Sequence, residues 1–495
     1  MAGIPPPTRN PEIKHNKIFI NNQFVNSTSN KAYPVYNPCD NEKVCEVQEG
    51  DKSDIDKAVQ ACKAAFKRGT PWRRMDASRL GHLLYRLADL MERDIAYMAS
   101  LETMDTGKPY KNSYQDMVHC IQVLRYFAGW ADKNMGESIP VDGDFFCYTR
   151  NEPVGVCGLL IPYNYPMLMM TWKMAPALAC GNCMIVKPAE QTPLTALYCA
   201  SLIKEAGFPP GVVNVVPGFG KICGQYISSH QEINKVSFTG STEVGMLVMQ
   251  DAGKSNLKRC SMQLSGKCPL VVFEDTELDF AVQQAHEAAF QNMGQCRWSG
   301  SRTYVHENIY DEFVKRAVEK ATSRKTGDPY EMDTEHGPQI DEEQYKKIME
   351  FIKKGKDKGA QLKCGGNRHG DKGFYVEPTV FSDVTDEMKF SQEEIFGPVQ
   401  LIMKFKDMDE VIDRCNNTDY GMAAAIFTND INRSITFTHA MYCGTVWVNT
   451  YNHWFPQAPF GGYKKSGLYR EMGKYTLQEY TEVKNIVYRI PQKNS

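Results

Sequence analysis

Two short groups of residues in this 495-residue chain have types and spacing that could hold a phosphorylated ligand. Ser241 lies in a Gly-Ser-Thr run just after an apolar segment that ends at Phe238, and the N–H groups at a helix N-terminus favour a pyrophosphate. Lys187 and Glu190 follow another apolar segment, and ligands bind at the ends of strands in open α/β sheets. Taken singly, Ser241 is better explained as an ordinary helix cap, and Lys187 and Glu190 as part of a solvated loop.

Other chemistry-bearing patterns are weaker. Cys180 and Cys183 form a C-x-x-C, but no second pair or nearby histidine completes a zinc site, so we expect no metal or redox chemistry there. Gly218, Gly220 and Gly224 come close to a dinucleotide-binding glycine motif with the wrong spacing, and they receive little weight. The 16 cysteines are spread along the chain, which is typical of reduced thiols in a reducing compartment.

Composition excludes several classes of protein. The formal charge is -2, with no basic surplus to attract nucleic acid. Residues 1–7 have no apolar stretch behind a basic start, so we expect no signal or transit peptide and a cytoplasmic protein. The apolar runs are too short to cross a bilayer, so no membrane role is expected.

The elements that must position these groups alternate along the chain. Predicted strands cover residues 154–161, 184–187, 212–216 and 235–238, with helices beginning near Pro166, Pro193, Lys221 and Ser241. This alternation predicts a doubly wound parallel sheet. An amphipathic helix over residues 79–98 is expected to pack on it.

A second α/β region is predicted after Pro269. Its expected strands are residues 270–273 and 302–306, and its expected helices are residues 281–292, 310–321 and 343–354. Residues 481–491 are rich in β-formers and predict a terminal strand that adds to a sheet elsewhere, with another subunit as one candidate.

Five separated motifs now carry a family resemblance. They are I-P-Y-N-Y-P at 161–166, K-P-A-E at 187–190, F-T-G-S-T-E-V-G at 238–245, E-E-I-F-G-P at 393–398 and P-F-G-G-Y-K at 459–464. Together they resemble the aldehyde dehydrogenases over essentially the whole chain. The resemblance implies an α/β fold with a Rossmann-type cofactor domain (residues 1–134 and 154–265), a catalytic-type domain (266–465) and an oligomerisation element with a C-terminal segment (135–153 and 466–495).

The resemblance also implies a cofactor site for NAD. In the family, the residues matching Lys187 and Glu190 hold the adenosine ribose, and the residue matching Glu394 holds the nicotinamide ribose. A carboxylate at Glu190 would repel a 2′-phosphate, which favours NAD over NADP. The expected cofactor-binding residues are Lys187, Glu190, Ser241, Gln344, Glu394 and Phe396.

The catalytic positions depart from the family pattern. The family's nucleophilic cysteine stands two residues after a Gly-Gln pair, and here Arg297 occupies that place. A guanidinium is always protonated and has no lone pair to attack a carbonyl carbon. Gln263 replaces the glutamate that activates water, whereas Asn164, which matches the oxyanion-stabilising amide, is retained.

The neighbours of Arg297 are expected to leave the site inert. If the segment is extended, Cys296 points to the opposite face and cannot replace the nucleophile. We expect Arg297 to turn toward Glu394, into the place of the nicotinamide ring, and so to weaken NAD binding. Trp298 and Tyr469 should narrow the site. The aromatics that align with the family's substrate tunnel are expected to serve as packing, and they are Trp172, Trp454 and Phe460.

The chain resembles the crystallins of mollusc lenses. Its arginine in place of the catalytic cysteine resembles the cephalopod form in particular. That resemblance implies a refractive, non-catalytic lens protein in the cytoplasm of lens fibre cells, with no cofactor required and weak NAD binding. It also implies a homotetramer, a dimer of dimers joined through residues 136–152 and the terminal strand, with other lens proteins as further partners. Two alternatives stay open: an NAD-dependent aldehyde dehydrogenase with an atypical site, and a non-catalytic binder of NAD or an aldehyde.

Overall fold

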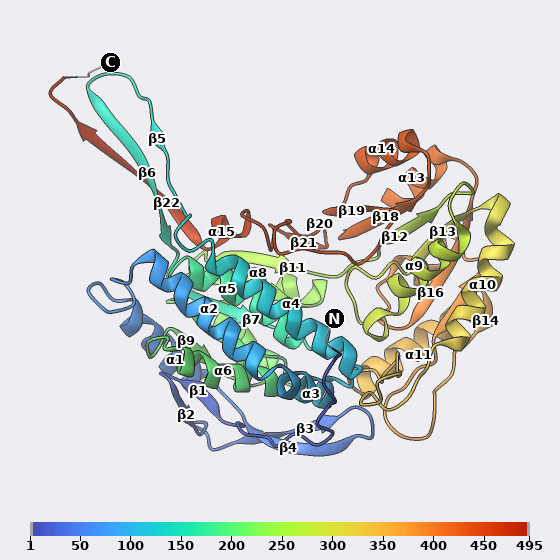
Figure 1. Cartoon of the computed structure of the whole chain (residues 1–495), viewed down its shortest axis with the longest axis horizontal. Coiled ribbons are helices and arrows are strands. Elements are labelled where there is room, and N and C mark those ends of the chain that lie inside the picture. Colours follow the sequence, from blue (N-terminus) through green and yellow to red (C-terminus); the bar gives the residue numbers. More distant parts are fainter. Residues whose placement is uncertain (1–2, 493–495) are drawn as a thin grey trace.

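The computed structural model describes residues 3–492 and places them around two large β-sheets, with a narrow arm at one end (Figure 1). The first large sheet has the strand order β2-β1-β9-β8-β7-β10-β11-β21. Its strands are β1 (Ile18–Ile20), β2 (Gln23–Val25), β7 (Val156–Leu160), β8 (Cys183–Lys187), β9 (Val213–Val215), β10 (Lys235–Thr239), β11 (Arg259–Gln263) and β21 (Gly467–Leu468).

The centre of this sheet, β7 to β11, is parallel, as the sequence predicts. Strands β7 to β10 match the four predicted strands to within two residues at each end, because short buried apolar runs define strands well. The antiparallel strands β1, β2 and β21 lie at the edges. Strand β21 falls in the segment assigned from sequence to the C-terminal part, and the proposed domain boundaries stay a prediction.

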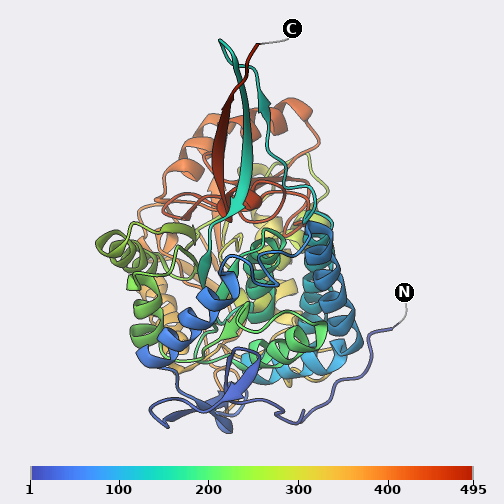
Figure 2. The same ribbon diagram turned by 90° about the vertical axis from the view of Figure 1, so that its left-hand side faces the viewer.

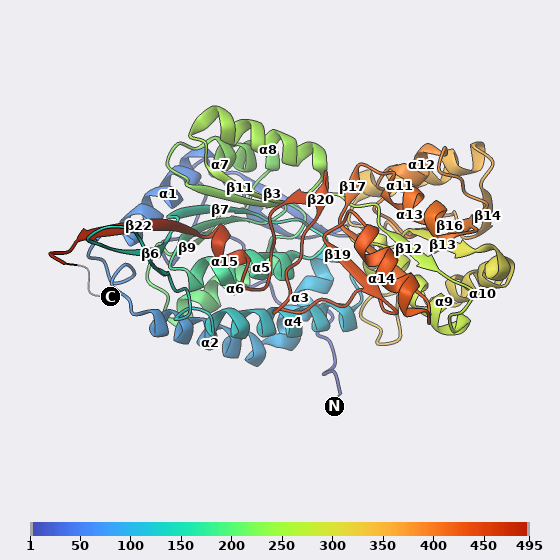
Figure 3. The same ribbon diagram turned by 90° about the horizontal axis from the view of Figure 1, so that it is seen from above.

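Helices cover both faces of the first sheet (Figure 3). They are α1 (Lys52–Phe66), α2 (Ala77–Arg93), α3 (Ile95–Thr106), α4 (Tyr110–Ala128), α5 (Pro166–Ala179), α6 (Leu194–Ala206), α7 (Gln225–Ser229) and α8 (Thr242–Ser255). The helix starts near Pro166, Pro193 and Ser241 are confirmed. The predicted start near Lys221 is instead a π-helical turn, η1 (Gly220–Gly224), that leads into α7.

The predicted helix over residues 79–98 is wrong in two respects. The chain breaks it at Asp94, where ψ of 14° ends α2 and α3 begins. The Asp94 carboxylate accepts hydrogen bonds from Arg93 and from the hydroxyl of Tyr198 on α6, so a tertiary contact fixes the break. Helix α2 packs mainly on α4, α5 and α6 rather than directly on the sheet.

The second large sheet confirms the predicted α/β region and has the order β14-β15-β16-β13-β12-β18-β19. Its strands are β12 (Pro269–Val272), β13 (Arg302–His306), β14 (Gln361–Cys364), β15 (Thr379–Ser382), β16 (Val399–Phe405), β18 (Ala423–Phe427) and β19 (Thr445–Val448). Its helices are α9 (Leu278–Phe290), α10 (Tyr310–Ser323), α11 (Glu342–Asp357), α12 (Lys389–Gln392), α13 (Met408–Asn416) and α14 (Ile431–Ala440).

Helix α9 ends at Phe290, before the predicted end at residue 292. A short 3-10 turn, η2 (Gln291–Gly294), comes next, with Asn292 and Met293 at left-handed φ values of 51° and 57°. This kink turns the chain sharply before Arg297. It therefore decides where the residue in the nucleophile's place points.

The arm is a small sheet of β5 (Ser138–Ile139), β6 (Phe145–Pro153) and β22 (Thr481–Arg489), which projects from the body (Figure 2). The predicted terminal strand is confirmed as β22. It pairs antiparallel with β6 of its own chain along its whole length, from Thr481 opposite Pro153 to Arg489 opposite Phe145. The sheet that it joins is therefore in its own chain, and a contact of this strand with another subunit stays a prediction.

The remaining short elements connect these sheets. They are β3 (Ala32–Asn37), β4 (Glu42–Gln48), η3 (Glu307–Ile309), β17 (Tyr420–Gly421), β20 (Tyr463–Lys464) and α15 (Thr476–Glu479). Of the helices within residues 3–492, none has the length and apolar character that a bilayer span needs.

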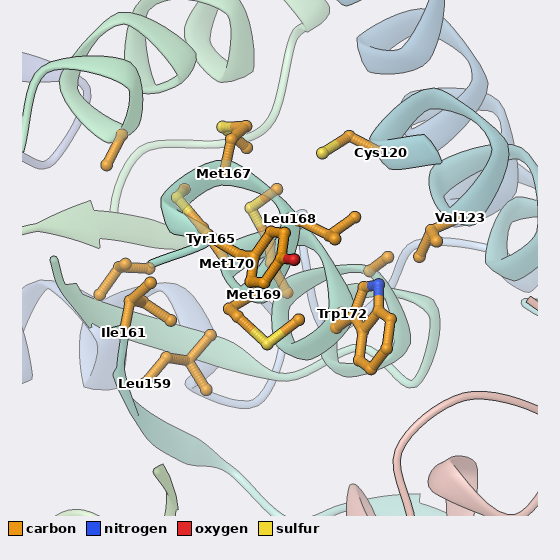
Figure 4. Close-up of a cluster of buried hydrophobic side chains, with 14 of the residues drawn as sticks. Cys120, Val123, Leu159, Ile161, Tyr165, Met167, Leu168, Met169, Met170 and Trp172 are labelled. Carbon is orange, nitrogen blue, oxygen red and sulfur yellow. The ribbon is translucent and has the colours of Figure 1, made fainter. Parts of the chain in front are cut away.

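Helix α5 begins directly after the loop that carries Asn164 and Tyr165, and it is buried on all sides. A helix that is apolar all round must lie inside a protein. Its side chains Met167 to Met170 pack with Cys120 and Val123 of α4, with Leu159 of β7 and with Ile161 just after that strand (Figure 4). This packing fixes the positions of Tyr165 and Trp172.

Candidate functional site

A cleft of about 960 Å³ lies at the carboxyl ends of β7, β8 and β10, the edge at which the sequence places a ligand. Residues from the second large sheet's region close its other side. The predicted cofactor-binding residues all line this cleft, together with Arg297, and they are Lys187, Glu190, Ser241, Gln344, Glu394 and Phe396. That they bind a cofactor stays a prediction.

Lys187 and Glu190 form an ion pair at the end of β8. The ammonium of Lys187 donates to Oε2 of Glu190 at 3.1 Å and to the carbonyl of Pro188 at 2.8 Å. Burial raises the pKa of Glu190, but the charge and hydrogen bond of Lys187 outweigh burial and hold that pKa below its ordinary value. Glu190 is therefore ionised at neutral pH and can accept a hydrogen bond from a ligand hydroxyl.

Ser241 caps helix α8 and also lines the cleft. Its hydroxyl oxygen accepts the backbone N–H of Val244 at 3.3 Å, which satisfies one of the free N–H groups of the first turn. The interpretation as a helix cap is thus confirmed. Because the helix N-terminus faces the cleft, the same turn favours a negatively charged group there.

Gln344 holds the loop that carries Glu394 and Phe396. Its side-chain amide donates to the carbonyl of Phe396 at 2.8 Å and to that of Ile395 at 3.2 Å. Phe396 has a left-handed φ of 57°, so the loop adopts a conformation that needs such support. Gln344 therefore positions the wall of the cleft.

Arg297 points into the cleft and is almost completely buried, with 7% of its side chain exposed. The guanidinium carbon lies 4.9 Å from the centre of the Phe396 ring, and Nη1 lies 3.9 Å from Oε2 of Glu394. The predicted turn of Arg297 toward Glu394 is confirmed. The guanidinium thus lies over the ring of Phe396 and beside Glu394, the residue expected to hold the nicotinamide ribose.

The backbone packs tightly behind this arginine. Glu394 accepts the N–H of Gly266 through Oε1 at 3.0 Å. A Cβ atom at Gly266 would lie 1.9 Å from the carbonyl oxygen of Arg297, so only glycine fits there. Gly266 therefore helps to fix both members of the Arg297–Glu394 pair.

Gln263 ends β11 and is buried. Its Oε1 accepts the hydroxyl of Thr239 at 3.0 Å, while its Nε2 has no hydrogen-bond partner among the described residues. Among those same residues, Gln263 does not line the large cleft. A side-chain amide does not titrate near neutral pH, so Gln263 cannot accept a proton from water.

Asn164 is held against the loop that leads to Arg297. Its side-chain N–H donates to the carbonyl of Gln295 at 2.9 Å, and Asn292 donates to the carbonyls of both Asn164 and Gln295. The retained amide is therefore partly occupied by the chain's own backbone. This ties the end of β7 to the segment after η2.

Cys296 is buried beside Arg297. The segment forms a turn at Arg297 and Trp298, so the assumption of an extended strand is wrong. Burial raises the pKa of the Cys296 thiol to about 12, and the nearby guanidinium offsets only part of that rise. Because the thiolate is the nucleophilic form, this thiol is unreactive at neutral pH.

Trp298 fills the space beside the cleft. Its ring stacks on Tyr165, with centres 5.6 Å apart, and on Trp172 at 6.4 Å, and it meets the edge of Phe460 at 5.1 Å. Trp172 also contacts Trp454. The cavity left next to Tyr165, Trp298 and Trp454 is about 80 Å³. Trp298 lines this cavity, and its narrowing of the site relative to the family stays a prediction.

The same ring cluster confirms the packing role of Trp172, Trp454 and Phe460. The expectation for Tyr469 is wrong. That side chain is 54% exposed, on a residue with φ of 72°, and it lines no described cavity among residues 3–492. A left-handed backbone directs it to solvent.

The cysteine motif lies outside the cleft. Cys180 and Cys183 are free and buried, and burial raises the pKa of both thiols. In the part of the chain that the structure describes, no three candidate metal-binding side chains come together.

Sequence reasoning missed one wall of the cleft. Apolar side chains of η1, of the residue before it and of α8 line this wall, and they are Phe219, Ile222, Val244 and Leu247. Gly220 and Gly224, set aside for their spacing, also line it. The sequence did carry a signal for this wall. The start of α8 has apolar residues that a solvent-exposed helix face does not need.

Comparisons with known proteins cover the whole chain. The model of the aldehyde dehydrogenase family matches residues 24–486. The sequence is 78% identical to omega-crystallin of Enteroctopus dofleini over 100% of both chains, and 58% identical to retinal dehydrogenase 2 of Homo sapiens over 99% of this chain and 95% of that one. The fold matches an NAD+ complex of aldehyde dehydrogenase from Bacillus cereus with a TM-score of 0.95, at 44% identity, over 96% of this chain and 97% of that one.

Proposed function

Since this chain belongs to the aldehyde dehydrogenase family, we propose that it is a member without the family's chemistry that serves as a structural, refractive protein of the eye lens. The full-length identity of 78% to an omega-crystallin supports this proposal. We place it in the cytoplasm of lens fibre cells. Its 24 Met, 25 Tyr and 23 Phe residues supply polarizable side chains, which suit a refractive role.

The observation that carries the proposal is the position of Arg297. A guanidinium cannot form the covalent bond to a carbonyl carbon that an active-site cysteine forms. Gln263 cannot take a proton from water in place of a carboxylate. Loss of a covalent nucleophile costs on the order of a millionfold in rate where catalytic residues act as a unit.

The cleft fits only part of a dinucleotide cofactor. The ionised Glu190 and the N-terminus of α8 suit a ribose and a pyrophosphate. The other end does not fit, because Arg297 lies beside Glu394 and over the ring of Phe396. We therefore propose that the protein requires no cofactor and that NAD binds weakly.

Self-association is part of the proposal. The arm exposes apolar side chains on a projecting sheet, including Phe146, Val483 and Val487. Exposed apolar surface of this kind marks an interaction site. It supports a homotetramer, built as a dimer of dimers, in which the arm joins the subunits.

A second candidate is an NAD-dependent aldehyde dehydrogenase with an atypical site. The 58% identity to retinal dehydrogenase 2 favours it. It requires a nucleophile, and Cys296, the cysteine next to Arg297 in the chain, is buried with its pKa raised to about 12. The geometry of the site therefore supports the first candidate better.

One comparison of variants separates these candidates. The unmodified chain and the Arg297→Cys, Gln263→Glu double variant are assayed for NADH formation from acetaldehyde, with Arg297→Cys alone as the matched control. We expect no turnover by the unmodified chain and measurable turnover only by the double variant. Equal turnover by the unmodified chain and the double variant would refute the structural role for this site.

A further inference from the structure

The guanidinium of Arg297 has no hydrogen-bond acceptor among the described residues, and it lines the cleft. Its Nε has no partner within residues 3–492, and Oε2 of Glu394, at 3.9 Å from Nη1, is beyond hydrogen-bond range. Burying a charged donor without acceptors is unfavourable. The Phe396 ring offers its face but no lone pair in the plane of the guanidinium. The cleft side of Arg297 therefore calls for an anion.

The remaining walls of the cleft indicate which anion. The capped N-terminus of α8, at Ser241, favours phosphate. The ionised Glu190 accepts a hydroxyl, and the apolar side chains of Phe219 and Leu247 offer a surface for a base. The cleft is large enough for a ligand with all three parts.

The end of the cleft at Arg297 selects among ligands according to the group that follows their phosphates. A dinucleotide must place a second ribose and ring beside Glu394 and Phe396, where the guanidinium already lies. A chain that ends in a free phosphate needs no such displacement. It also gains charge-assisted hydrogen bonds from the fork of donors on Arg297.

We propose that this cleft binds a nucleoside diphosphate or triphosphate, with its terminal phosphate at Arg297, in preference to a dinucleotide. This inference shares one assumption with the proposed function, namely that the cleft binds a nucleotide and catalyses no reaction. The carboxylate of Glu394 opposes the phosphate charge. Because its Oε1 is held by the N–H of Gly266, this carboxylate is fixed in place, and it reduces the preference without abolishing it.

The test is calorimetric titration of the full chain with ADP, ATP, AMP and NAD in the same buffer. We expect ADP or ATP to bind about tenfold or more tightly than NAD, because one hydrogen bond to a charged group is worth about that factor. The Arg297→Met variant should bind ADP and ATP about tenfold more weakly than the unmodified chain and discriminate against NAD less. Arg297→Lys, the matched control, retains a charge and should keep part of the preference.

Three results would overturn the proposal. They are NAD binding as tightly as ADP and ATP to the unmodified chain, no binding of either mononucleotide, and affinities for ADP and ATP that Arg297→Met leaves unchanged. Far-ultraviolet circular dichroism of each variant checks that it is folded. If Arg297→Met is unfolded, the deciding measurement is the ratio of ADP affinity to NAD affinity in the unmodified chain and in Arg297→Lys. The NADH assay decides the proposed function separately, because nucleotide preference and turnover are measured independently.

Discussion

Nη1 of Arg297 lies 3.9 Å from Oε2 of Glu394, and this approach joins the turn after η2 to the loop after α12. The two residues are far apart in the sequence and belong to segments that line the same cleft. Glu394 is anchored to Gly266 through its other oxygen, so the carboxylate is fixed and the guanidinium takes its position from it. The pair occupies one end of the cleft.

Removing the ring of Trp298 should destabilise the protein. In Trp298→Ala, the loss of stacking on Tyr165 and Trp172 leaves a buried cavity, and such truncations cost about 3–5 kcal/mol. Thermal unfolding followed by circular dichroism should show a clear fall in Tm.

The matched control for this change is Tyr469→Ala, which truncates an aromatic ring on the surface. Its effect should stay within about 0.5 kcal/mol, as for most surface substitutions. A Tm for Trp298→Ala equal to that of Tyr469→Ala would show that Trp298 is not packed as described.

Lys267 should make stability depend on pH in the alkaline range. Its burial, with the nearby charge of Arg302, lowers its pKa from 10.5 to about 7, and Nζ donates to the carbonyl of Phe390 at 3.2 Å. Between pH 7 and 10.5 the unfolded chain keeps this proton and the folded chain does not. Because the unfolded state then binds more protons, stability rises with pH.

The comparison for this prediction is Lys267→Met, which removes the titrating group and keeps the apolar stem. The Tm of the unmodified chain minus that of the variant should rise from about pH 7 to about pH 9.5, since all other groups titrate alike in both proteins. A difference that stays flat or falls across this range would contradict the described burial of Lys267.

The arm should control self-association. Val483 and Val487 are exposed on β22, with Val483 68% exposed, and a charge at both positions would oppose burial in an interface. Val483→Lys with Val487→Lys should shift the sedimentation coefficient to that of a smaller species. The control Lys484→Gln, which removes only a surface ion pair with Glu152, should not. Unchanged sedimentation of the double variant would place the interface elsewhere.

Sequence patterns predicted the elements that depend on local composition. Strands β7 to β10 are short apolar runs, and α8 starts at the serine that caps it, so each is defined within a few residues. The location of Arg297 in the nucleophile's place also comes from motif spacing. Its direction toward Glu394 was predicted from charge alone, since a buried guanidinium needs a counter-charge.

Features that depend on tertiary contacts were not predicted correctly. The break between α2 and α3 is fixed by Asp94 and Tyr198, which are far apart in the sequence. The left-handed residues Asn292 and Met293 end the helix early, where the sequence predicted a helix as far as residue 292. The role of Gln344 in holding the Phe396 loop is likewise visible only once the chain is folded.

The most direct test of the central claim is aldehyde oxidation by the purified, unmodified chain. The protein at high concentration is mixed with NAD and either acetaldehyde or retinal, and NADH is followed at its absorbance maximum for hours. With a guanidinium at position 297 and an amide at position 263, the predicted result is no NADH above a protein-free control. Steady NADH formation that saturates with aldehyde and scales with protein concentration would contradict it.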